Sequence, residues 1–162
     1  MEAEEAIVRP GPRAMRLPGV YVGRRAYPHE LPERTGIVVD LTAEFPENRW
    51  IRENLRYLCI PTLDADAPDL ESIESALPSV LAAQGGIYIH CAAGHGRSAS
   101  LAAVLLIHLG VETTLEGVLE RLKKARPKIG LSRPQLRLVS RFADSAPAHR
   151  DGVSSSPSAP GE

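Results

Sequence analysis

Residues 86–109 read GIYIHCAAGHGRSASLAAVLLIHL and join two apolar runs through a loop of small residues. The first run, 86–90, is typical of a short buried strand. The second, 98–109, is apolar nearly all round, which is typical of a buried helix. Ligands of α/β domains bind where strands end and helices begin. We therefore expect the loop between the two runs to lie at a binding edge.

Strand and helix patterns alternate along the rest of the chain. The expected strands are residues 19–23, 36–41 and 55–60, and the expected helices are 70–81, 113–125 and 132–142. Pro78 should kink or split the first of these helices. Ser132 is expected to cap the last one. This order predicts an α/β fold with a single domain, in which helices flank a central, mostly parallel sheet.

Composition limits the class of protein. The chain has 162 residues, of which 43% are hydrophobic and 24% charged, so one globular domain with a real core is expected. With 19 basic and 20 acidic residues the net charge is −1, which favours neither nucleic acid nor an anionic membrane. The two cysteines, Cys59 and Cys91, exclude a disulfide scaffold and a four-thiolate zinc site.

Both ends differ in composition from the middle. Residues 1–15 are charged and carry two prolines, and residues 145–162 are rich in Pro, Ser and Gly. We expect a flexible segment at 1–15, a folded domain at 16–144 and a disordered tail at 145–162. The N-terminal segment has no hydrophobic signal sequence, and the longest apolar run, 101–109, is shorter than the roughly 20 residues of a membrane span. A cytoplasmic location is therefore expected.

The 91–97 loop carries the chemistry. Five small or polar residues separate Cys91 from Arg97, namely Ala92, Ala93, Gly94, His95 and Gly96. Such a loop can turn its backbone N–H groups toward one anion, and the planar fork of Arg97 matches a phosphate. The same positive field favours the thiolate of Cys91, which is then an activated nucleophile. Ser98 is placed to donate its hydroxyl to the sulfur, and His90 is expected to buttress the loop.

A general acid is sought in the 61–68 loop, which follows the strand at 55–60. Asp64 is the first choice and Asp66 the second. Turn formation is the alternative reading of Asp64, since aspartate is favoured in turns.

These residues resemble the signature of the cysteine-dependent protein tyrosine phosphatase superfamily, and the chain looks like a small atypical dual-specificity phosphatase. The signature is His-Cys, five residues, then Arg-Ser, with glycine at the third place after the cysteine. Outside it, Pro61-Thr62-Leu63-Asp64 followed by Ala67-Pro68 is similar to the general-acid loop of bacterial and plant members. The resemblance covers residues 16–144.

The resemblance implies a role for each matching residue. Cys91 would be the nucleophile, Arg97 would bind phosphate and stabilise the transition state, and Asp64 would act as acid and then base. Ser98 would assist departure of the thiolate, and residues 92–96 would bind phosphate through their amides. The implied activity is hydrolysis of phosphotyrosine, phosphoserine or phosphothreonine in proteins through a phosphocysteine intermediate, with no metal or cofactor.

Several alternatives stay open at this point. The substrate can instead be a lipid phosphate, an RNA 5′-phosphate or a metabolite, or the chain can be a weakly active phosphate-binding pseudophosphatase. Arsenate reduction and sulfur transfer use similar loops, but arsenate reduction usually needs further cysteines. A regulatory disulfide between Cys59 and Cys91 is also open. Eight basic residues and no acid lie from Arg121 to Arg141, and Arg133 is expected to come nearest the pocket.

Overall fold

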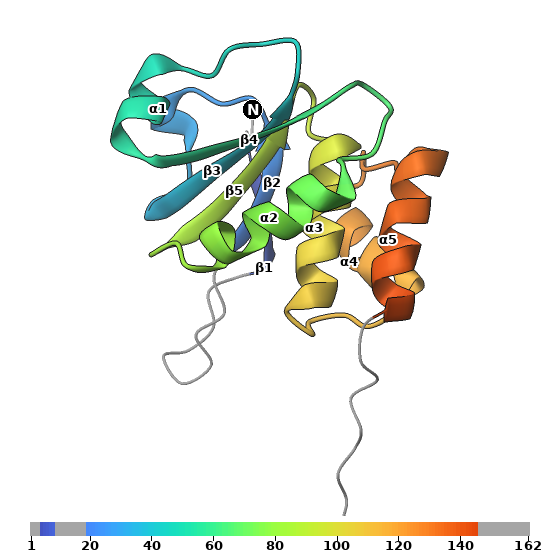
Figure 1. The fold of residues 1–162 in the computed structure, drawn as a ribbon. Helices are drawn as coiled ribbons and strands as arrows, with labels where there is room; N and C mark the ends of the chain where they lie inside the picture. Colours follow the sequence, from blue (N-terminus) through green and yellow to red (C-terminus); the bar gives the residue numbers. More distant parts are fainter. Residues whose placement is uncertain (1–3, 9–18, 146–162) are drawn as a thin grey trace, which may run out of the picture.

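A computed structural model of the protein describes residues 4–8 and 19–145, and its core is one five-stranded sheet (Figure 1). The strand order is β1-β2-β5-β3-β4. The strands are β1 (Glu4–Val8), β2 (Val20–Arg24), β3 (Thr35–Thr42), β4 (Arg56–Thr62) and β5 (Gly86–Cys91). The last four run parallel, and β1 pairs antiparallel with β2. The prediction of a mostly parallel sheet is confirmed.

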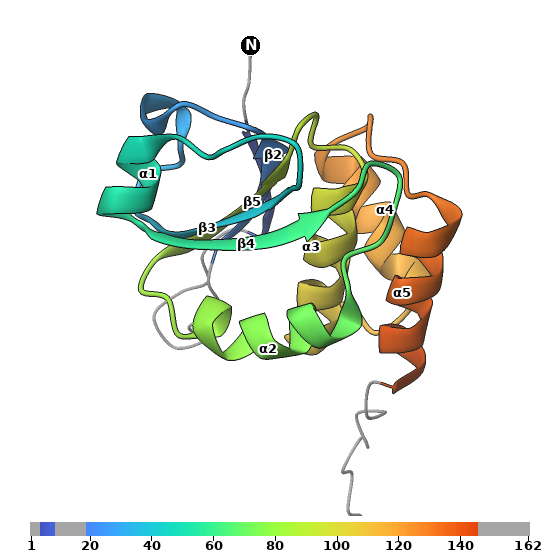
Figure 2. The ribbon, with the colours of Figure 1, turned by 45° about the horizontal axis from the view of Figure 1, so that its top comes forward.

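Helices cover both faces of the sheet. They are α1 (Arg49–Asn54), α2 (Leu70–Leu81), α3 (Arg97–His108), α4 (Leu115–Ala125), α5 (Arg133–Ser145) and a short 3-10 helix, η1 (Pro28–Glu30). Figure 2 shows α1 on one side of the sheet and α2 to α5 on the other. None of the helices in the described ranges is long and apolar enough to span a bilayer.

Strand β3 shows why the sheet is buried on both faces. Its residues Ile37, Val39 and Leu41 belong to the main core with α2 to α5. The alternate residue Val38 packs with Ile51 of α1 in a smaller cluster on the other face. Successive side chains of a strand point to opposite faces, so three consecutive β-branched residues serve both cores.

The structure differs from the sequence-based expectations in three places. Helix α1 was not predicted, because it has six residues and buries one of them, Ile51. Strand β1 lies inside the 1–15 segment that was expected to be flexible, and four of its residues, Glu4, Glu5, Ala6 and Val8, pair with residues of β2. Helix α2 continues through Pro78 to Leu81 and is not split. Residues 1–3, 9–18 and 146–162, which make up most of the two predicted flexible ends, lie outside the described residues.

Candidate active site

The 91–97 loop lies at the carboxyl edge of the parallel strands, as predicted. Strand β5 ends at Cys91 and α3 begins at Arg97. Gly94 has φ +76°, and a side chain there would clash with the backbone carbonyl of Gly23 at the end of β2. Only glycine fits this position. Gly96 has φ −124° and ψ −75°, so it does not adopt the left-handed conformation of Gly94. A Cβ at Gly96 would instead lie 3.1 Å from the side chain of Gln135.

Cys91 is buried, and its sulfur is surrounded by hydrogen-bond donors. Its Sγ lies 3.3 Å from Ser98 Oγ and accepts the backbone N–H of Gly94 at 3.2 Å. Burial by itself raises the pKa of the Cys91 thiol. Hydrogen bonds from the hydroxyl of Ser98 and from the backbone N–H groups of Ser98, Gly94 and His95 together lower it by more, so the pKa lies below its usual value. The Ser98–sulfur contact expected from the sequence is therefore present, and the site favours a thiolate.

Arg97 is held rigidly beside the cysteine. It is 4% exposed, and its Nη1 donates to the backbone carbonyl of Thr62 at 2.9 Å. Its Nη1 and Nη2 each donate to one carboxylate oxygen of Glu44 at 2.8 Å. The hydrogen bond from Arg97 lowers the pKa of the Glu44 carboxyl to about 2. The paired bonds fix the plane of the guanidinium.

Glu44 was not singled out from the sequence. It follows β3, whose carboxyl end lies at the same edge of the sheet as the end of β5. An acidic residue just after a central parallel strand is the signal that could have found it.

The 61–68 loop separates the two acid candidates. Asp64 Oδ1 lies 3.7 Å from Arg97 Nη2, and its side chain is 92% exposed. Asp64 also lines the cleft that contains Cys91. Asp66 does not line this cleft, and its carboxylate accepts the backbone N–H of Ala67 at 2.8 Å. The geometry favours Asp64 as the residue that can reach a leaving group.

These side chains meet in a cleft of about 740 Å³. Its wall is made by Glu44, Phe45, Asp64, Ala65, Cys91, Ala92, Ala93, His95, Gly96, Arg97, Gly130, Leu131, Ser132 and Gln135. Of the predicted phosphate-binding residues, Gly94 is not part of the wall, and its N–H donates to the sulfur of Cys91. Phe45 and Leu131 are the large apolar side chains of this wall, which mixes polar and apolar residues.

Of the basic residues from Arg121 to Arg141, Arg126 donates a hydrogen bond to a residue of the cleft wall. Arg133 is exposed and is not part of the wall. Arg126 instead donates from Nη2 to the carbonyl of Ala93 at 3.2 Å. Burial lowers the pKa of His95, and the charges of Arg126 and Lys128 lower it further. Positive charge therefore lies beside the mouth of the cleft.

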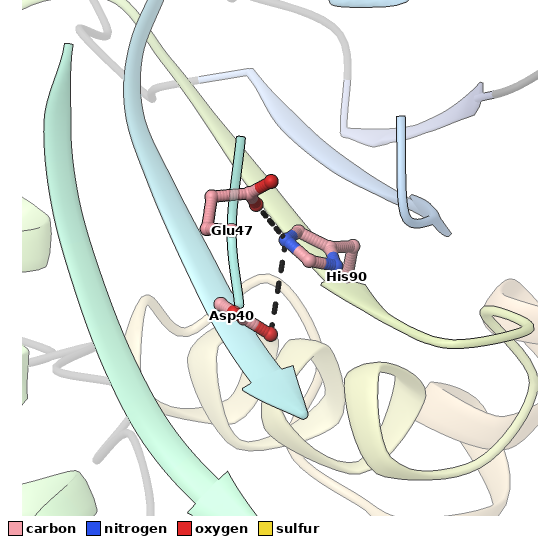
Figure 3. Close-up of side chains that lie close together, drawn as sticks. All are labelled: Asp40, Glu47 and His90. Carbon is pink, nitrogen blue, oxygen red and sulfur yellow. Dashed lines mark hydrogen bonds and ion pairs between the residues drawn. The ribbon is translucent and has the colours of Figure 1, made fainter. Parts of the chain in front are cut away.

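His90 lies on the other face of the sheet, between two buried carboxylates (Figure 3). Its Nε2 lies 2.6 Å from Glu47 Oε2 and 3.8 Å from Asp40 Oδ1. Burial lowers the pKa of His90, but the two carboxylates raise it above its usual value. Its Nδ1 lies 3.3 Å from the carbonyl of Cys91, to which a protonated Nδ1 donates. This contact agrees with the expected buttressing role.

Asp40, Glu47 and His90 are close enough together to be considered as metal ligands, since their ligand atoms lie within 4.8 Å of one another. The 2.6 Å separation of His90 Nε2 and Glu47 Oε2 is that of a charge-assisted hydrogen bond. Two ligands of one zinc ion at about 2 Å each would stand roughly 3 Å apart or more. Asp40 also accepts bonds from Thr42 and from the hydroxyl of Tyr57. The cluster is therefore an internal ion network.

The position of Cys59 answers the question of a regulatory disulfide. Both cysteines are free, and β3 lies between β4 and β5 in the sheet. Two strand spacings put Cys59 and Cys91 about 10 Å apart, beyond the roughly 7 Å limit for a disulfide. The pKa of Cys59 is raised by burial and by Asp40. A Cys59–Cys91 disulfide does not fit this fold.

Comparisons with solved structures show which folds are similar. PTPMT1 in complex with PI(5)P is 22% identical, with a TM-score of 0.65 over 77% of this chain and 90% of that one. Tk-PTP in its active form is 20% identical, with a TM-score of 0.65 over 88% of this chain and 97% of that one. Human DUSP28 is 15% identical, with a TM-score of 0.66 over 90% of this chain and 96% of that one. The comparison with curated protein sequences gave no match.

The sequence itself matches a family model. The model for the dual specificity phosphatase catalytic domain covers residues 33–144, which include the 61–68 loop, the 91–97 loop and nearly all of α5. The chain therefore belongs to the dual specificity phosphatase family, as a small atypical member of the cysteine-dependent protein tyrosine phosphatase superfamily.

Proposed function

We propose that the chain hydrolyses phosphomonoesters through a phosphocysteine on Cys91. The observation that carries this proposal is the meeting of three groups in one cleft: a buried thiol with a lowered pKa, the guanidinium of Arg97 and the exposed carboxyl of Asp64. A nucleophile, an anion-binding group and an acid are the parts that this reaction needs.

In the first step the phosphate binds to the amides of the 91–97 loop and to Arg97. The thiolate of Cys91 attacks phosphorus, the bond from phosphorus to the ester oxygen breaks, and Asp64 gives its proton to that oxygen. The product alcohol leaves, and Cys91 carries the phosphoryl group. Arg97 keeps its orientation during this step because Glu44 and the Thr62 carbonyl hold its Nη atoms.

In the second step Asp64, now ionised, takes a proton from a water molecule. The water oxygen bonds to phosphorus and the sulfur–phosphorus bond breaks, which releases inorganic phosphate and the thiolate. The Ser98 hydroxyl, 3.3 Å from the sulfur, donates to the departing thiolate and lowers the barrier to this step.

For the substrate, we propose phosphotyrosine, phosphoserine or phosphothreonine in a protein. The match to the dual specificity phosphatase family supports this class. The cleft is wide enough at about 740 Å³ for an aromatic or an aliphatic phosphoester, and Phe45 and Leu131 offer apolar contact to either. A cytoplasmic location fits this proposal, because a reducing compartment keeps Cys91 as the free thiol.

A lipid phosphate is the second candidate. It is favoured by the similarity to PTPMT1, which was solved in complex with PI(5)P. The 22% identity of that pair supports a shared fold, and the assay below distinguishes a protein substrate from a lipid substrate.

The test compares three substrates in the presence of EDTA: a panel of phosphotyrosine and phosphothreonine peptides, vesicles that carry a phosphoinositide, and a generic aryl phosphate. Wild type and Cys91→Ser are assayed side by side. The proposal predicts turnover of peptides that disappears in Cys91→Ser. Turnover of vesicles alone selects the lipid candidate. Failure of the reduced, folded wild type on all three would contradict the phosphatase activity and favour a binding module.

A further inference from the structure

The segment that carries Asp64 has little packing of its own. Residues 63–66 are all exposed, and Leu63 is exposed to 69%. Ala65 has φ +61°, a left-handed conformation that is unfavourable for a residue other than glycine. Exposed, strained segments keep one conformation only where surrounding contacts impose it.

Two side chains from outside this loop, within the part of the chain that the structure describes, donate hydrogen bonds to its backbone. Arg97 Nη1 donates to the carbonyl of Thr62 at 2.9 Å. Gln135 Nε2 donates to the carbonyl of Asp66 at 2.8 Å. Asp64 lies midway in the sequence between these two carbonyls, so both bonds constrain the backbone that carries its side chain.

The carboxamide of Gln135 is well placed for this task. Gln135 is 1% exposed and lies in the first turn of α5. Its Oε1 accepts the backbone N–H of Ser132 at 2.9 Å, which is one half of a capping box at the start of the helix. The opposite amide orientation would set two donors against each other at Ser132 and two acceptors against each other at Asp66. Both ends of the carboxamide are therefore committed.

We propose that Gln135 is a positioning residue for general acid catalysis: it couples the start of α5 to the 61–68 loop and holds Asp64 over the 91–97 loop. The inference rests on the proposed function, because it assumes that Asp64 protonates the leaving group. Gln135 touches neither the sulfur nor the leaving oxygen in this proposal. Its effect on the reaction passes entirely through the position of Asp64.

The test uses the dependence of rate on the leaving group. A good leaving group such as dinitrophenolate departs without a proton, whereas phenolate needs the acid. The measured quantity is the kcat/KM for phenyl phosphate divided by that for dinitrophenyl phosphate. This ratio does not depend on the fraction of enzyme that is folded, so a loss of stability alone cannot change it.

Three variants separate loss of the hydrogen bond from Gln135 to the Asp66 carbonyl from other effects. Gln135→Glu keeps the acceptor that the capping box needs and deletes the donor to Asp66. Gln135→Met deletes the donor without adding charge. Gln84→Glu makes the same chemical change at an exposed position after α2 and serves as the matched control.

We expect the ratio to fall at least about tenfold in both Gln135 variants, within the roughly 10²- to 10⁴-fold range of general acid catalysis. It should stay within about twofold in Gln84→Glu, since exposed surface changes away from the site have small effects. In an Asp64→Asn background, Gln135→Glu should lower the ratio no further, because two residues that act through one group are not additive.

An unchanged ratio in both Gln135 variants, together with a large fall in Asp64→Asn, would overturn the positioning role and leave the proposed function intact. An unchanged ratio in Asp64→Asn itself would contradict the acid assignment of the proposed function, and the role of Gln135 would be overturned with it. An additive loss in the double variant would show that Gln135 acts independently of Asp64 and would also overturn the inference.

Discussion

Replacement of Glu47 by glutamine removes the charge that faces His90 and, at 3.8 Å, the Nε of the half-exposed Arg25. The two side chains lie 2.6 Å apart and are each 1% exposed, so solvent and salt screen the pair little. If the glutamine carbonyl accepts the hydrogen bond from His90, its NH2 group faces the backbone N–H of Asn48, which donates to Glu47 Oε1 at 2.6 Å in the wild type. The shape of the side chain is almost unchanged. Asp40, whose Oδ1 lies 3.8 Å from His90 Nε2, still attracts the charged form of His90 in this variant.

The expected loss of stability follows from these contacts. Removal of one partner of a buried ion pair costs about 3–5 kcal/mol. The hydrogen bond that remains and the second carboxylate reduce this cost, and we expect the free energy of unfolding to fall by about 2–3 kcal/mol, in line with hydrogen bonds to charged groups. At roughly 3 °C per kcal/mol for a chain of this size, the Tm should fall by about 6–9 °C.

The effect should depend on pH in a defined direction. The pKa of the Glu47 carboxyl is lowered from its usual 4.5, so its contribution is present above that value and is lost as the pH falls through the lower folded value. The pKa of His90 is raised from its usual 6.5, so its contribution is present below that value and is lost as the pH rises through the higher folded value. The difference between wild type and Glu47→Gln should therefore be largest between these two usual values.

The assay is thermal unfolding followed by circular dichroism across this pH range. Glu53→Gln is the matched control, because Glu53 is exposed and pairs with Arg49 on the surface of α1. Such surface pairs contribute about 0–1 kcal/mol. Equal Tm values for wild type and Glu47→Gln at about pH 5.5, or a difference that stays constant up to about pH 9, would refute the reasoning.

Four other substitutions test the site. Gly94→Ala places a side chain against the Gly23 carbonyl at a residue with φ +76°. It should lower kcat/KM for an aryl phosphate by roughly 100-fold or more, since small misplacements of reacting groups cost that much, and retained activity would contradict the close contact between Gly94 and Gly23. Ser98→Ala removes the hydrogen bond that lowers the pKa of Cys91 most, so the acid limb of the pH profile of kcat/KM should move to higher pH. Breakdown of the phosphoenzyme should slow about tenfold or more, and an unmoved limb together with no pre-steady-state burst would contradict this role. Asp64→Asn should lower kcat/KM for phenyl phosphate by about 10²- to 10⁴-fold and Asp66→Asn by far less; the reverse order would move the acid to Asp66.

The main elements could be predicted because their signals are local. The apolar run before Cys91, the glycines after it and the apolar run after Arg97 are contiguous in the chain. Contiguous patterns determine strand, loop and helix without knowledge of the rest of the fold. The relative placement of Cys91, Ser98 and Arg97 followed from these local patterns.

The partners of these residues could not be predicted in the same way. Glu44 and Glu47 lie more than 40 residues before the side chains that they contact, Arg97 and His90. Their contacts exist because β3 pairs with β5 in the sheet, which brings residues 40–47 beside residue 90. Strand order is not encoded in periodicity, so this half of the site appears only in the three-dimensional structure.

Arg133 was expected to come nearest the pocket, but it does not line the cleft, for a related reason. Its place after the helix cap was correct, but the direction of a side chain in the first turn depends on how α5 packs. Arg126, at the end of α4, reaches the carbonyl of Ala93 instead.

The central claim is that Cys91 carries the phosphoryl group during turnover. The most direct test is an acid quench of the enzyme during turnover of an aryl phosphate with EDTA present, followed by peptide mass spectrometry; Ser98→Ala is included to let the intermediate accumulate. The account predicts one phosphate on the peptide that contains Cys91, with none on Cys59, and complete loss of label and turnover in Cys91→Ser. Turnover without phosphate on Cys91, or turnover that persists in Cys91→Ser, would contradict it.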